Sequence, residues 1–214
     1  MFDPWRWRLV CVEEFRGGGA APIAQVPPTV QPTVTPLIVM SPTAEVTPTL
    51  TPIPYEQLIP ADWKQFKTPL VEIWLPKNFK LADKKTVNNT AAFSGSELLI
   101  TEIPSKSSAY NMLVNVSYEL MTGDSLDTFV RDQFPTLPYQ AHVSDYQTVY
   151  VNTVEGRKIT IELRVNNIDV NDMVYVFQDG NTVWYVQYMA QISEFYDNLA
   201  VFEQSVKTFR PTKY

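Results

Sequence analysis

The 214-residue chain has very few of the residues on which most catalytic and metal sites depend. It contains one histidine, His142, and one cysteine, Cys11. A zinc site needs several histidine or cysteine ligands, so no zinc site is predicted. A single cysteine also excludes a disulfide within the chain, and cysteine usage therefore leaves the redox compartment open.

Glycine is scarce as well, with seven residues in all, three of them consecutive at 17–19. The other four, Gly95, Gly123, Gly156 and Gly180, lie far apart. Phosphate-binding loops need closely spaced glycines, as in the G-x-G-x-x-G and Walker patterns. No nucleotide-phosphate loop is therefore predicted.

Long apolar runs are missing from the first 25 residues. The longest stretch there, Leu9-Val10-Cys11-Val12, stops at Glu13. It is shorter than the apolar core of a signal peptide, which takes about 7–15 residues. It is also far below the roughly 18 apolar residues of a membrane-spanning helix. We therefore read residues 1–25 as an N-terminal segment with no clear signal peptide.

Proline and threonine, by contrast, are concentrated in residues 26–54. This stretch holds eight of the seventeen prolines and seven threonines, with Glu45 as its one charged residue. Proline fixes φ and removes a backbone donor, so neither a helix nor a central strand can run through it. We predict a disordered, extended linker of polyproline-II type that separates residues 1–25 from a globular domain at 55–214.

The composition of this linker also bears on location. Pro/Thr-rich stretches are typical of O-glycosylated stalks, and a stalk requires an anchor in front of it. We therefore expect an extracytoplasmic protein, at the cell envelope or secreted, whose signal peptide or membrane anchor lies upstream of Met1. The alternative is a cytoplasmic protein with an unusual tail.

The charge of the predicted domain argues against nucleic acid. Residues 55–214 carry 19 acidic and 14 basic side chains, and the basic ones are scattered. Phosphate backbones are bound by basic patches, so no nucleic-acid partner is expected. A domain of this length is large enough to bury one sizeable core.

Apolar periodicity predicts strands and two helices in this domain. Ser125 or Asp124 caps a helix that ends near Phe134, and Ser193 caps a last helix that ends before Pro211. Tyr55–Phe66 is expected to be a lead-in with one helical turn. The predicted strands are Val71–Leu75, Ala91–Phe93, Leu98–Ile103, Met112–Leu120, Gln147–Val154, Arg157–Val165, Met173–Phe177 and Thr182–Ala190.

The pattern on these strands predicts how they are covered. Met112–Leu120 alternates, which predicts a half-exposed strand with Asn115 and Ser117 on the solvent face. The last two strands, joined through Asp179-Gly180-Asn181, are apolar on both faces and must be covered on both. The fold class is therefore α+β, a mainly antiparallel sheet flanked by helices on both faces.

Few side chains point to a reaction. His142, Ser144 and Asp145 lie within four positions, whereas a catalytic triad converges from separate directions, so we interpret them as polar loop residues. Carboxylates are numerous but scattered. A hydrolase that uses them, or the His142 cluster, stays open as an alternative function.

One stretch is rich in the oxygen ligands that calcium prefers. It contains Asn167, Asp169, Asn171 and Asp172, but it lacks the glycine and the distant glutamate of an EF-hand loop. Asn and Asp also fill hairpin turns, because they tolerate left-handed φ. We favour the hairpin turn and keep a weak calcium loop as the alternative.

Several short stretches, in their order along the chain, resemble one family. They are Val71-Glu72-Ile73-Trp74-Leu75-Pro76 with Phe79, the helix Ser125–Phe134, Val154-Glu155-Gly156-Arg157-Lys158, and the run from Val183 through Tyr196 to Ser205-Val206-Lys207-Thr208-Phe209. Together, over about residues 62–210, they resemble the PsbP-like domains, the family of the extrinsic photosystem subunit and its bacterial relatives.

The resemblance implies an α/β/α sandwich, a fold shared with a nuclear-transport factor that binds Ran. It further implies an extracytoplasmic, non-enzymatic binding or accessory domain. We expect no cofactor, a partner that is an unidentified protein or small ligand at the cell envelope, and membrane contact only through the upstream anchor. A purely structural cell-surface module is a further alternative.

Overall fold

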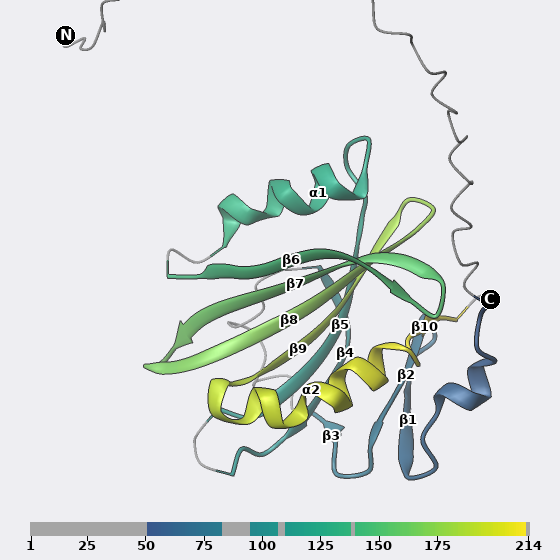
Figure 1. Ribbon diagram of the computed structural model, residues 1–214, viewed down its shortest axis with the longest axis vertical. Coiled ribbons are helices and arrows are strands. Elements are labelled where there is room, and N and C mark those ends of the chain that lie inside the picture. Colours follow the sequence, from purple (N-terminus) through teal and green to yellow (C-terminus); the bar gives the residue numbers. More distant parts are fainter. Residues whose placement is uncertain (1–50, 83–94, 107–109, 138–139, 213–214) are drawn as a thin grey trace, which may run out of the picture. The chain divides into compact units, whose positions relative to one another are not determined.

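The computed structural model describes residues 51–82, 95–106, 110–137 and 140–212 (Figure 1). The predicted strand Ala91–Phe93 and all but the last four residues of the predicted linker lie outside these ranges. A 3-10 turn, Tyr55–Leu58, opens the described chain. The strands are β1 Trp63–Lys67, β2 Val71–Pro76, β3 Lys80–Leu81, β4 Ser96–Ile103, β5 Met112–Leu120, β6 His142–Val151, β7 Val154–Val165, β8 Ile168–Asp179, β9 Thr182–Gln191 and β10 Arg210–Pro211; the helices are α1 Leu126–Gln133 and α2 Ile192–Val206.

The strands form two antiparallel sheets. Seven of them follow the order β3-β4-β5-β9-β8-β7-β6, and β1, β2 and β10 form a small sheet with β2 in the middle. The hairpins β6–β7, β7–β8 and β8–β9 make neighbours of strands that follow each other in sequence. The mainly antiparallel sheet predicted from the apolar pattern is confirmed.

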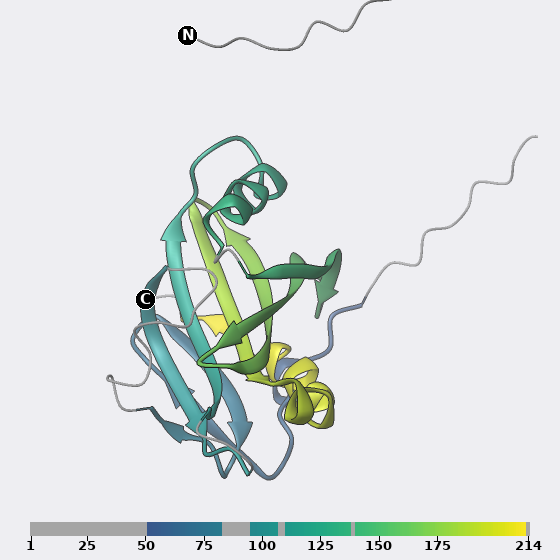
Figure 2. The same ribbon diagram turned by 90° about the vertical axis from the view of Figure 1, so that its left-hand side faces the viewer.

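The two helices cover opposite faces of the large sheet, which Figure 2 shows from the side. Along β8, Met173, Tyr175 and Phe177 share a core with α2, whereas Val174 and Val176 share one with α1. Alternate side chains of a strand point to opposite faces, so the two cores lie on the two sides of the sheet. The flanking of the sheet by helices on both faces is therefore confirmed.

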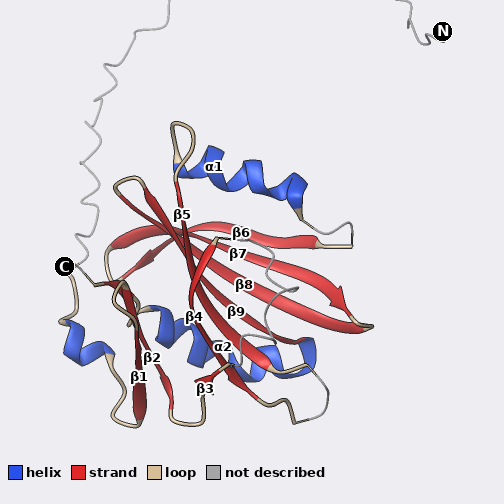
Figure 3. Cartoon of the chain, turned by 180° about the vertical axis from the view of Figure 1, so that it is seen from behind, coloured by secondary structure: helices blue, strands red, loops and turns tan. Residues whose placement is uncertain are grey.

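The small sheet completes the α2 side. Phe66 of β1 and Val71, Ile73 and Leu75 of β2 belong to the same core as α2 (Figure 3). β1 was not predicted, because Lys64 and Lys67 flank the one residue of this strand that is buried. The lead-in predicted for Tyr55–Phe66 thus contains a strand as well as the helical turn.

Helix α1 is fixed at its start and along its length. The Ser125 hydroxyl accepts a hydrogen bond from the backbone N–H of Thr128, as an N-cap does. Asp127 binds both Nε and Nη2 of Arg157 on β7, at 2.7 and 2.8 Å. The hydrogen bonds from Arg157 hold the pKa of the Asp127 carboxyl well below its usual range.

Two expectations about single positions were wrong, one about exposure and one about secondary structure. Asn115 and Ser117 on β5 are buried rather than exposed, and the Asn115 amide donates to Gln187 of β9 at 2.9 Å. His142 opens strand β6 instead of lying in a loop, although its side chain is exposed. In the described ranges no helix is long and apolar enough to cross a membrane.

Candidate functional site

The turn between β6 and β7 adopts an uncommon backbone conformation. Val151 pairs with Val154, so Asn152 and Thr153 alone make the turn, with φ values of 45° and 76°. Positive φ at both positions matches the right-handed twist of a hairpin, and asparagine tolerates it. A β-branched threonine rarely adopts positive φ. The sequence therefore contains no signal for a turn here, and the predicted strand Gln147–Val154 included both turn residues.

Beyond this turn, Gly156 allows an aromatic ring to lie against the sheet. Gly156 pairs with Phe177 of β8, and a Cβ added at Gly156 would come within 2.7 Å of that ring. The Phe177 ring also stacks on Phe209, which follows α2, with ring centroids 5.9 Å apart. These two rings come from segments more than thirty residues apart and meet on the α2 side of the large sheet.

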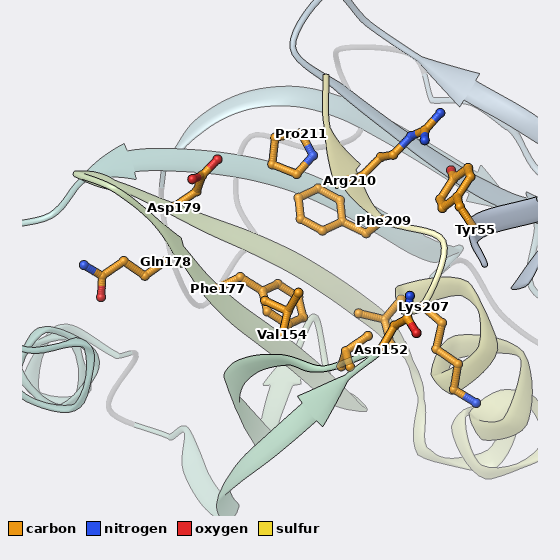
Figure 4. A pocket seen from close by; sticks show the side chains of 12 residues that line it. Tyr55, Asn152, Val154, Phe177, Gln178, Asp179, Lys207, Phe209, Arg210 and Pro211 are labelled. Atoms are coloured by element: carbon orange, nitrogen blue, oxygen red, sulfur yellow. The ribbon is translucent and has the colours of Figure 1, made fainter. Parts of the chain in front are cut away.

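They form part of a pocket of about 330 Å³, seen from close by in Figure 4. Its walls come from the β6–β7 turn, the end of β8, the segment that follows α2, and the start of the described chain. Its lining residues are Tyr55, Val151, Asn152, Val154, Phe177, Gln178, Asp179, Val206, Lys207, Phe209, Arg210 and Pro211. This volume lies at the lower end of the range for small-molecule sites.

The rim of this pocket holds the start of the described chain, at the end of the predicted linker. The Asn152 side chain accepts a hydrogen bond from the Ile53 N–H at 2.7 Å, and its amide donates to the Ile53 carbonyl at 3.0 Å. One side chain thus satisfies both backbone groups of one residue. Ile53, assigned to the linker by composition, therefore contacts the domain.

A buried carboxylate fixes the other side of the rim. Glu72 of β2 accepts from the Tyr55 hydroxyl at 2.7 Å and from Arg210 Nε at 2.6 Å. The guanidinium of Arg210 lies over the Tyr55 ring, 3.8 Å from its centroid. Burial alone would raise the pKa of Glu72, but the hydrogen bonds from Tyr55 and Arg210 outweigh it and the pKa lies below its usual value. Burial raises the pKa of Tyr55.

The His142 cluster lies elsewhere and its members are directed apart. Ser144 donates its hydroxyl to the Thr160 carbonyl at 3.1 Å, and Asp145 accepts from Gln147 at 2.6 Å. His142 lines a separate, more open hollow of about 480 Å³.

The four residues proposed for calcium binding are distributed around one hairpin. Asn166 and Asn167, both with positive φ, form the two-residue turn between β7 and β8. Asp169 lies 3.6 Å from Arg164, while Asn171 donates to the Tyr196 hydroxyl at 3.4 Å. Asp172 is buried on the opposite face from Asn171 and accepts from Gln187 at 3.5 Å. Within the part of the chain that the structure describes, no three His, Cys, Asp or Glu side chains are grouped so as to hold a metal ion.

Sequence reasoning missed the pocket. Its residues come from four separate segments, none of which carries a motif for binding. Two residues near the pocket do carry a sequence signal, because Gly156 and Phe209 lie in stretches that resemble the PsbP-like domains. A glycine in the middle of a strand often marks the close approach of another group, and here that group is the ring of Phe177.

Comparisons with known proteins give a fold and no closer relationship. No family model and no curated protein matches the chain. The solution structure of cyanobacterial PsbP from Synechocystis sp. PCC 6803 matches 71% of this chain and 94% of its own, with a TM-score of 0.50 and 9% identity. The domain therefore has the PsbP-like fold, as the resemblance predicted.

Two further solved structures are similar over much of the chain. PA94 from Pseudomonas aeruginosa, a putative regulator of unknown function, has 11% identity and a TM-score of 0.49, covering 72% of this chain and 100% of its own. LpqN from Mycobacterium tuberculosis, which is involved in cell envelope biogenesis, has 13% identity and a TM-score of 0.45, covering 67% of this chain and 83% of its own.

Proposed function

We propose that the protein is a non-enzymatic binding or accessory domain that works outside the cytoplasm on a Pro/Thr-rich tether, and that the pocket beside Asn152 is its binding site. The observation that carries the proposal is the pocket itself. Its walls include Phe177, Phe209 and Val154, and polar groups of Asn152 and Asp179 lie among them. Apolar walls with a few convergent polar groups are the usual composition of a ligand site.

The attachment of the tether supports the same proposal. Tyr55, the first residue after the linker, lines the pocket, and Ile53 is bound at its rim. A ligand bound in the pocket would therefore lie beside the start of the described chain. Val154, 52% exposed, also leaves apolar surface open at this place.

The proposal is tested by placing a charge in the pocket. We expect 1-anilinonaphthalene-8-sulfonate to bind the full-length protein with increased fluorescence. Val154→Glu should lose most of that increase, because it removes apolar surface from the pocket wall and its carboxylate repels the sulfonate of the dye. The matched control is Tyr150→Glu, which adds the same charge at a position 58% exposed that does not line the pocket. Equal dye binding by the two variants would contradict the proposed site.

The proposed location has its own test. A surface cysteine at Tyr150, introduced in a Cys11→Ser background, should react in intact cells with a small maleimide that cannot cross the cytoplasmic membrane. Labelling that appears only after lysis would contradict a location outside the cytoplasm.

A further inference from the structure

The tripeptide Pro52-Ile53-Pro54 is bound through the backbone of its middle residue. Proline has no N–H, so Ile53 is the one residue of the three that can both donate and accept a backbone hydrogen bond. The Asn152 side chain takes both of these groups, at 2.7 and 3.0 Å. Asn152 therefore binds the backbone of a proline-flanked residue and leaves the Ile53 side chain 50% exposed.

The conformation of the bound segment and the walls beside it agree with this chemistry. Pro54 has φ −52° and ψ 137°, close to the polyproline-II conformation. The adjoining pocket is lined by Tyr55, Phe177 and Phe209. Grooves lined by aromatic side chains recognise polyproline-II segments, because these segments are extended before they bind and lose little conformational entropy.

The turn that presents Asn152 contains a residue in an uncommon backbone conformation. Thr153 has φ 76°, a conformation that β-branched residues rarely adopt, and such outliers gather at binding sites. The turn of Asn166 and Asn167 has the same left-handed geometry, yet Asn166 makes no such contact among the described residues. The two turns thus differ in their contact with an extended segment.

We propose that Asn152 and the adjoining pocket form a receptor for an extended, proline-flanked peptide segment of a partner protein. Pro52-Ile53-Pro54 is a resident segment of the same chemistry, which the partner displaces. This inference rests on the proposed function and names the class of its ligand. Because the resident segment is tethered, its local concentration is high and it weakens the apparent affinity for the partner.

The experiment uses full-length protein and a fluorescent peptide with the sequence Thr-Pro-Ile-Pro-Tyr. Ile53→Pro removes the resident N–H while keeping the segment extended, so we expect this variant to bind the peptide more tightly than the unmodified protein. Adding Asn152→Gly to it should weaken binding at least about tenfold, because both hydrogen bonds are lost. Adding Asn166→Gly instead, the matched control in the other left-handed turn, should leave binding unchanged.

A second peptide isolates the contact with the Asn152 carbonyl oxygen. Methylation of the isoleucine nitrogen removes the only donor of the tripeptide and should weaken binding to Ile53→Pro, but change nothing in its Asn152→Gly derivative. The inference is overturned if Asn152→Gly does not change the affinity for the peptide. It is also overturned if Ile53→Pro does not bind the peptide at millimolar concentration. If the dye still depends on Val154 in that case, the proposed pocket survives and only its ligand class fails.

A second copy of the chain is the competing occupant. In sedimentation experiments we expect Ile53→Pro to stay monomeric at concentrations at which it binds the peptide. If Ile53→Pro self-associates and adding Asn152→Gly abolishes this, the site binds the same segment of another copy. That result would overturn the proposal that the occupant is a partner protein.

Discussion

Phe202 offers a quantitative test of the α2 side of the fold. Its side chain is fully buried, with its ring 4.9 Å from that of Tyr188 on β9 and 5.6 Å from that of Phe195. Phe202→Ala would leave a cavity in a core shared by both sheets, and such substitutions cost about 3–5 kcal/mol of unfolding free energy. With a urea m-value of about 2 kcal/mol/M, the unfolding midpoint should fall by about 1.5–2.5 M.

The assay is urea unfolding followed by tryptophan fluorescence and by circular dichroism, so that coincident curves check two-state behaviour. The matched control is Tyr196→Ala on the same helix, where the ring is 63% exposed. Its cost should stay well below that of Phe202→Ala, because it leaves no buried cavity and removes one long hydrogen bond from Asn171. A Phe202→Ala midpoint that hardly moves would refute the packing of α2 on the sheet. Helix α2 would then be a free surface available to a partner.

Three further predictions concern the site and the acid stability of the fold. Gly156→Ala should destabilise the protein and weaken dye binding, because its Cβ would meet the Phe177 ring at 2.7 Å; unchanged binding and midpoint would contradict this packing. Thr153→Gly should raise the unfolding free energy by about 1 kcal/mol, measured in urea, because glycine adopts positive φ without strain. The pKa values of Asp127 and Glu72 are lowered on folding, so their contribution is present above the pKa of the unfolded carboxyls and is lost as pH falls through the folded values. Thermal unfolding should therefore show stability falling below about pH 5, and less steeply in Asp127→Asn.

Local sequence signals were sufficient to predict elements whose conformation depends mainly on their own residues. Met112–Leu120 was predicted with its observed bounds, because its alternation is unbroken. The turn within Asp179-Gly180-Asn181 was predicted from its glycine, which the structure places at φ 60°. The last helix was also predicted at its place after the final strand, although α2 begins at Ile192 with Gln191 as its N-cap, ahead of the predicted cap Ser193.

The failures share a different cause, which is that burial depends on elements far apart in the chain. Asn115 and Ser117 are polar and alternate with apolar residues, so they were predicted to face solvent, yet they are buried on the α1 side of the sheet. The candidate site was missed for the same reason. Asn152 becomes informative only when Ile53, 99 positions earlier, lies beside it.

The arrangement around Glu72 has a mechanical consequence. If residues 26–54 act as the proposed tether, a pull on them would reach the domain first at Ile53 and Tyr55, and Tyr55 is hydrogen-bonded to Glu72 on the central strand of the small sheet. That strand is paired on both sides, and Arg210 brings the C-terminal strand to the same carboxylate. The contact at Asn152 consists of two hydrogen bonds, so it should break before β2 separates from the strands on both of its sides.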